Sequence, residues 1–81
     1  MQIRVLIFGV LADRIGRRDL EVDLPAGATV GALLDALATG HEVIAAMRGN
    51  LAVAVNMAYA LPGDVLAATD EVALIPPVSG G

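Results

Sequence analysis

Between residues 19 and 37 the spacing of the apolar side chains changes from every second residue to every third or fourth. Residues 19–24 alternate acidic and apolar side chains without exception, which predicts a strand with one solvent-facing side. Four apolar residues then follow at the i, i+3, i+4 and i+7 positions of a helix: Val30, Leu33, Leu34 and Leu37. The chain must therefore bury one face of a sheet against one stripe of a helix.

Signals at its ends support this helix. Thr29 is predicted to be the N-cap, because its hydroxyl can accept a hydrogen bond from a free amide of the first turn. Gly40 is expected to end the helix in the left-handed conformation. Shorter helices are expected over residues 10–15, before Gly16, and over residues 42–47, before the turn at residues 49–50.

The remaining strands are predicted from short apolar runs. They cover residues 3–8, 51–55 and 71–75, with a short strand at 59–61. Only Arg4 interrupts the first run, so we expect that strand to be covered on both faces. Pro76 and Pro77 end the last strand, because proline lacks the N–H that a central ladder needs.

The order of these elements predicts an α+β protein. A pair of strands, one main helix and three further strands give a single mixed sheet with the helix on one face. The helix can carry the chain across that face, so the first and last strands can lie side by side and parallel. This is the β-grasp, or ubiquitin-like, arrangement. We expect one domain over residues 1–76 and an extended tail over residues 77–81.

Composition excludes several classes of function. The net charge is −4 and all five basic residues are arginine, which makes a poor binder of nucleic acid. The absence of cysteine excludes disulfides and thiolate metal sites. The longest uncharged stretch, residues 49–63, is shorter than the roughly 20 residues that span a bilayer. No secretory signal is visible, so we expect no membrane association and a cytoplasmic protein.

Few residues offer catalytic chemistry. His41 has no histidine or cysteine near it in the sequence, so a capping or surface role is expected and no metal site is predicted. The carboxylates of the alternating strand (Asp19, Glu21 and Asp23) are interpreted as a solvated face. Met47 and Met57 are predicted to fill the core, and Asn56 to form a turn.

The last residues of the sequence have unusual physical properties. Pro76 and Pro77 hold the backbone extended, and Gly80 and Gly81 make the tip thin enough to enter a channel that admits only backbone. Val78 and Ser79 lie between them. The terminal carboxylate would be inert until activated, for example as an acyl-adenylate. A frayed end is the alternative.

Three segments resemble a known family. They are residues 3–9 with Leu11-Ala12-Asp13 and Gly16, residues 51–56, and residues 70–81 with the proline pair and the double glycine. Over its full length the chain resembles the small subunit of molybdopterin synthase, the MoaD family of ubiquitin-like sulfur carriers.

The resemblance implies a mechanism for the tail. An E1-like adenylating enzyme would use ATP to adenylate Gly81, and a sulfurtransferase would supply the sulfur of a Gly81 thiocarboxylate. The chain would then bind the synthase's large subunit, in a heterotetramer, and donate sulfur to cyclic pyranopterin monophosphate. Pro76 to Gly80 would thread the tail. No stably bound cofactor and no catalytic site of its own are implied.

The resemblance also implies a partner-binding patch of Phe8, Tyr59 and Ile75. Ordinary core packing is the alternative for Phe8 and Ile75. Other functions stay open: a sulfur carrier for thiamine, cysteine or tRNA thiolation, a protein modifier conjugated to lysine through Gly81, or a plain binding module with an idle tail.

Overall fold

The computed structural model describes residues 1–77, which form one mixed sheet with helices packed on it. The elements follow in the order β1 (Gln2–Ile7), α1 (Gly9–Ile15), β2 (Asp19–Asp23), α2 (Val30–Gly40), α3 (Glu42–Met47), the 3-10 turn η1 (Arg48–Asn50), β3 (Ala52–Val55), β4 (Ala58–Tyr59) and β5 (Val72–Ile75). The predicted α+β class and element order are confirmed.

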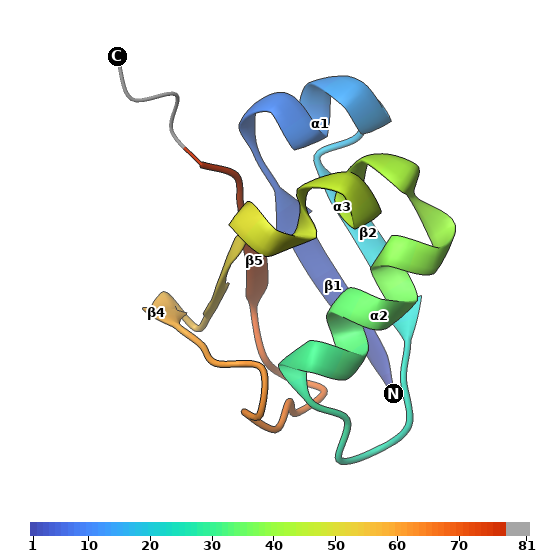
Figure 1. Ribbon diagram of the computed structural model, residues 1–81. Coiled ribbons are helices and arrows are strands. Elements are labelled where there is room, and N and C mark those ends of the chain that lie inside the picture. Colours follow the sequence, from blue (N-terminus) through green and yellow to red (C-terminus); the bar gives the residue numbers. More distant parts are fainter. Residues whose placement is uncertain (78–81) are drawn as a thin grey trace.

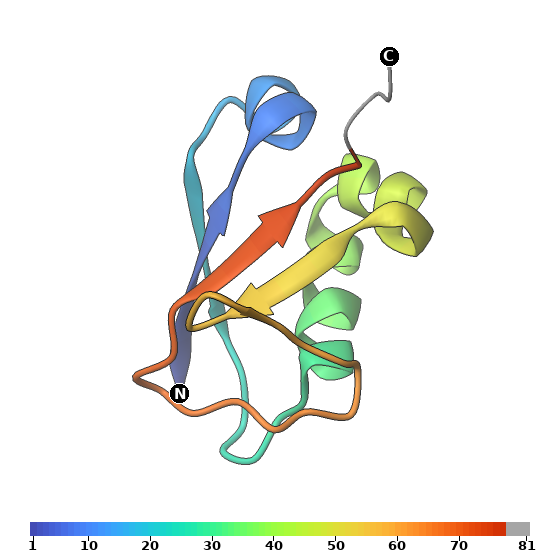
Figure 2. The ribbon, with the colours of Figure 1, turned by 90° about the vertical axis from the view of Figure 1, so that its left-hand side faces the viewer.

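The sheet has the strand order β2-β1-β5-β3-β4. β1 and β5, the first and last strands, lie side by side and parallel, with Ile7 opposite Leu74. The other pairs are antiparallel. Figure 2 shows β1, β5 and β3 as neighbours that fan out with the twist of the sheet. The β-grasp topology predicted from the element order is therefore confirmed.

The helices lie on one side of this sheet (Figure 1). The side chains that are almost wholly inaccessible come from the sheet's helix-facing side and from the helices: Ile3, Val5, Ile7, Leu11, Val30, Leu33, Ile44, Val72 and Leu74. In β1 they alternate with exposed Gln2 and Arg4 and half-buried Leu6. The prediction that the first strand is covered on both faces is wrong, because no element of residues 1–77 packs on the other face.

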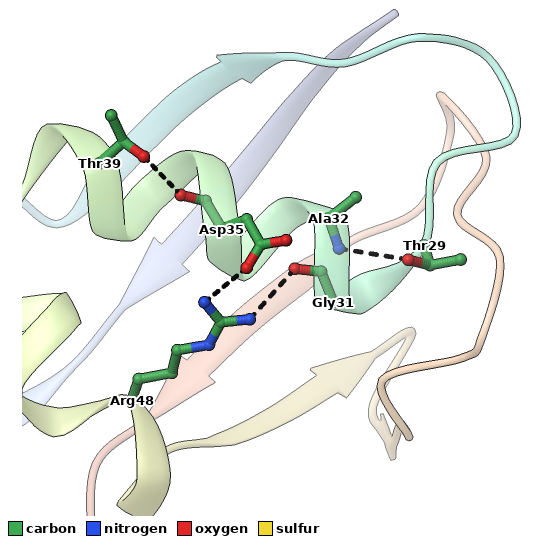
Figure 3. Close-up of polar contacts among 6 residues, drawn as sticks. All are labelled: Thr29, Gly31, Ala32, Asp35, Thr39 and Arg48. Carbon is green, nitrogen blue, oxygen red and sulfur yellow. Dashed lines mark hydrogen bonds and ion pairs between the residues drawn. The ribbon is translucent and has the colours of Figure 1, made fainter.

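Local signals explain where α2 begins. The Thr29 hydroxyl accepts a hydrogen bond from the Ala32 amide at 3.2 Å, as predicted for the N-cap (Figure 3). Gly40, however, is the last helical residue and has no left-handed conformation. Instead His41 is extended, with φ −140°, and is both the C-cap of α2 and the N-cap of α3. Because α3 starts immediately, one extended residue joins the two helices.

Arg48 ties the end of the helical layer back to α2. Its guanidinium forms an ion pair with Asp35 at 2.6 Å and donates a hydrogen bond to the Gly31 carbonyl at 3.5 Å (Figure 3). Both side chains are partly exposed, so the ion pair contributes little to stability, about 0.2–1 kcal/mol. These contacts join η1, which leads directly into β3, to α2.

The strand bounds differ slightly from those predicted. The strands expected at 19–24, 51–55 and 71–75 are each one residue shorter, and β4 is Ala58–Tyr59 in place of 59–61. A two-residue loop at Asn56 and Met57 sets this register, with Val55 opposite Ala58. Within the described part of the chain, no helix is long and apolar enough to cross a bilayer.

Candidate functional site

The face of the sheet that carries no helix has a shallow apolar hollow. In its middle Ala73 of β5 lies between Leu6 of β1 and Ala54 of β3, and Tyr59 of β4 is opposite Ala54. The hollow has a volume of about 380 Å³ and is lined by Leu6, Phe8, Ala54, Met57, Tyr59, Glu71, Ala73 and Ile75. Small alanines at the centre and large side chains around them give this surface its concave form. We call these eight residues the open-face patch.

The three predicted partner-binding residues all lie in the open-face patch. Phe8 is 49% exposed and Tyr59 is 80% exposed, while Ile75 is half-buried. Core packing is therefore wrong for Phe8, which follows β1 on the side away from the helices. A contiguous apolar surface of this kind is typical of a site that another macromolecule covers.

The predicted tail begins beside this patch. Because β1 and β5 are parallel, both end at the same edge of the sheet, where Gly9 meets Pro76. Gly9 has a φ of +57°, and an added Cβ there would lie 3.2 Å from the Pro76 ring. Glycine thus allows both the sharp bend into α1 and the close approach of the proline.

The structure brings Pro76 and Pro77 to this edge and describes nothing further along the chain. The other residues assigned to the tail (Val78, Ser79, Gly80 and Gly81) lie outside the described residues. Their predicted roles stay predictions.

Met57 contradicts its predicted place in the core. It is 93% exposed and lies at the tip of the β3–β4 hairpin, at the rim of the open-face patch. Asn56 and Met57 have φ values of 52° and 69°. Positive φ at both central residues of a two-residue loop is what a type I′ hairpin turn requires. The predicted turn at Asn56 is confirmed.

Asp70 and Asn56 connect this hairpin to the start of β5. The Asn56 amide nitrogen donates to Asp70 at 3.0 Å, and the Glu71 N–H donates to the Asn56 side-chain oxygen at 2.9 Å. Asp70 also accepts from the Ala67 N–H at 2.8 Å. The hydrogen bond from Ala67, then that from Asn56, holds the pKa of Asp70 below its usual value of 3.8.

This depressed pKa predicts a loss of stability in acid. The ionised Asp70 stabilises the fold above the unfolded pKa, and this contribution disappears as the pH falls through the lower folded pKa. Asp70→Asn is therefore expected to lower the Tm at pH 7 and to flatten the dependence of Tm on pH below about 4. Thermal unfolding monitored by circular dichroism over this pH range measures both effects.

Asp13→Asn is the control for this experiment, since the Asp13 side chain is exposed and forms no hydrogen bond or ion pair with residues 1–77. It should leave the pH dependence close to that of the wild type. Equal pH profiles for Asp70→Asn and the wild type would contradict a stabilising role for the hydrogen bonds that Asp70 accepts from Ala67 and Asn56.

The β2 side of the open face is charged. Arg4 forms a close ion pair with Asp19 at 2.8 Å, and Glu21 and Asp23 are exposed on the same face. This confirms the solvated acidic face predicted for the alternating strand. In the described part of the chain no group of three or more His, Cys, Asp or Glu residues could hold a metal ion.

No local sequence pattern indicates the roles of two residues at this site, Gly9 and Asp70. The signal for Asp70 was its place directly before the last strand, but its partner Asn56 is 14 residues away along the chain. No local pattern indicates the contact between Gly9 and Pro76, because two parallel strands bring it about.

Comparison with known proteins assigns the family. The model of the ThiS family matches residues 5–81. The chain belongs to the ThiS family. Its β-grasp fold is the one described above. The resemblance to ubiquitin-like sulfur carriers, predicted from three segments of the sequence, is confirmed.

Relatives of this ThiS-family chain include carriers and a modifier. The molybdopterin synthase sulfur carrier subunit of Arabidopsis thaliana is 32% identical over 81 residues, covering 100% of this chain and 84% of the plant protein. Small archaeal modifier protein 1 of Haloferax volcanii is 39% identical over 83 residues, covering 93% of this chain and 95% of the archaeal protein. A crystal structure of that modifier matches with a TM-score of 0.86 and 37% identity, covering 100% of both chains.

Proposed function

We propose that this protein is the sulfur-carrier small subunit of a molybdopterin synthase. The observation that supports the proposal best is the open-face patch lying beside the edge where β5 ends at Pro76. A partner that covers this patch is placed next to the origin of the tail. The relative from Arabidopsis thaliana, which is similar over the whole chain, is named for this role.

In this proposal the chemistry takes place at the Gly81 carboxyl carbon. A carboxylate oxygen attacks the α-phosphate of ATP in an E1-like enzyme, pyrophosphate leaves, and an acyl-adenylate forms. Sulfur at the oxidation level of sulfide, supplied by a sulfurtransferase, then displaces AMP and gives the thiocarboxylate. The carrier provides no catalytic group of its own, which agrees with its lack of cysteine.

In the large subunit the thiocarboxylate sulfur then forms a bond to a side-chain carbon of cyclic pyranopterin monophosphate, and a carbon–oxygen bond at that carbon breaks. Water then hydrolyses the acyl–sulfur bond, which leaves the sulfur on the pterin and returns Gly81 to a carboxylate, so the carrier can be used again. Two such transfers supply the two sulfur atoms of the molybdopterin dithiolene. The double glycine allows the tail to enter a narrow channel, and Pro76 and Pro77 keep its base extended.

Deleting Gly81 is expected to abolish sulfur loading while leaving the domain folded. Intact mass spectrometry of the protein purified from its own host should show a mass increase equal to replacement of one oxygen by sulfur. That increase should map to Gly81 and be absent from the deletion variant. Asp13→Asn is the control, since Asp13 is exposed and lies outside both the tail and the open-face patch.

The same preparation identifies the pathway. A large subunit that co-purifies with the loaded carrier would support synthesis of molybdopterin. A carrier that stays unmodified while its host makes molybdenum cofactor would contradict the proposal.

A second candidate function is protein modification through Gly81. It is favoured by the similarity to small archaeal modifier protein 1 over nearly the whole length of both proteins. Activation would be the same, but the acceptor would be a lysine amine, which gives an isopeptide bond with loss of AMP. Because this chain has no lysine, it cannot form lysine-linked chains on itself. Because Arg48 is the last basic residue, tryptic peptides of the host proteome would carry residues 49–81 on target lysines only in this case.

A further inference from the structure

Met57 occupies a backbone conformation that suits glycine. Its φ is 69° in the two-residue hairpin turn, where the preferred sequence is Asn-Gly. A side chain in the left-handed region is strained by the approach of its Cβ to the backbone. Asn56 tolerates this conformation well, but methionine has no short polar group that compensates locally. The turn sequence is therefore not the one that stability alone would favour.

The methionine side chain gains nothing within the domain in return. It is 93% exposed and is not among the side chains that pack on the core. Backbone strain persists only where the surrounding structure over-determines it, and such residues concentrate at functional sites. Here the hydrogen bonds of the Asn56 side chain with Asp70 and with the Glu71 N–H hold the turn in place.

The place of Met57 suggests its use. It stands at one end of the open-face patch, and Phe8 and Ile75 lie toward the tail at the other. A rigid hairpin therefore presents a long, flexible apolar side chain beyond the concave surface. Methionine adapts to irregular apolar pockets because it is unbranched and its thioether is polarisable.

We propose that Met57 is an anchor that inserts into an apolar pocket on the large subunit when that subunit covers the open-face patch. This inference rests on the proposed function, since it names the contact that the hairpin makes with the same partner. The partner pocket would be lined by apolar or aromatic side chains and would lie at the edge of the interface far from the tail. The strain in the turn is retained because removing it would also remove the anchor.

The test compares stability and affinity in the same variants. Met57→Gly relieves the strain and removes the side chain, so we expect the Tm to rise by about 4 °C while the affinity for the large subunit falls about tenfold. Met57→Gln keeps the length of the side chain and the strain, so its Tm should stay near that of the wild type while its affinity also falls. Calorimetric titration with the purified large subunit of the same host, together with thermal unfolding, gives both quantities.

Leu61→Gln is the matched control, because Leu61 is also exposed but does not line the patch. Its affinity should equal that of the wild type. If the wild-type protein binds the large subunit and both Met57 variants bind it equally well, the anchor is overturned but the proposed function is not. A fall in Tm for Met57→Gly would overturn the strain on which it depends. A wild-type protein that does not bind the large subunit at all would overturn the proposed function and the anchor together.

Discussion

Phe8→Asp is expected to weaken binding of the large subunit by about 30-fold or more while the domain stays folded. Phe8 lines the open-face patch and is half exposed in the isolated domain, so the core does not need it. In the complex an aspartate at this position would place an unpaired charge in an apolar interface, which is costly. Isothermal titration calorimetry gives the affinity, and far-ultraviolet circular dichroism checks the fold.

Val65→Asp is the control for this substitution. Val65 is another exposed apolar residue, in the loop before β5, and it does not line the patch. The two variants make the same change of charge, so any general electrostatic effect on binding should be equal in both. Loss of affinity in Val65→Asp to the same extent would show that the large subunit does not use the patch.

Leu74→Ala is expected to lower the free energy of unfolding by about 2–5 kcal/mol. Leu74 is wholly inaccessible and sits in β5 between Ile7 of β1 and Val53 of β3. Truncation leaves a cavity under the helices that the paired strands cannot close. A small domain has only about 5–15 kcal/mol of stability in total. The variant should therefore unfold at a clearly lower urea concentration than the wild type. Urea unfolding measures the change.

The neighbouring residue provides a control on the opposite face. Ile75 points to the open face and is half-buried, so Ile75→Ala should cost only about 1 kcal/mol. It removes apolar surface from the patch and should instead reduce the affinity for the large subunit. Equal losses of stability in the two variants would contradict the one-sided core.

Periodicity predicted the elements that carry strong local patterns. The alternation of β2 and the apolar stripe of α2 lie where expected, and α3 covers the predicted residues 42–47. Thr29 caps α2 as expected, because a cap is a contact between residues three apart. The parallel pairing of β1 with β5 followed from the order of the elements and the position of one crossover helix.

Local patterns could not predict which side of the sheet would be open. An apolar run such as residues 3–8 is compatible with cover on both faces or with an apolar surface that awaits a partner. For the same reason the apolar segment around Met57 predicts a core position, whereas in the structure the hairpin turn directs this side chain into solvent. The prediction that Gly40 would be a left-handed cap was wrong. α3 starts at Glu42, so the chain turns at the extended residue His41 and Gly40 stays helical.

The sequence by itself determined the strands, the main helix, their order and the proline pair that leads into the tail, because each depends on neighbours within a few residues. Only the tertiary structure decided that Phe8, Tyr59 and Ile75 share one exposed hollow. The same is true of the close approach of Gly9 to Pro76 and of the hydrogen bond that Asp70 accepts from Asn56. These contacts join segments far apart in the chain. They exist only once β5 has inserted between β1 and β3.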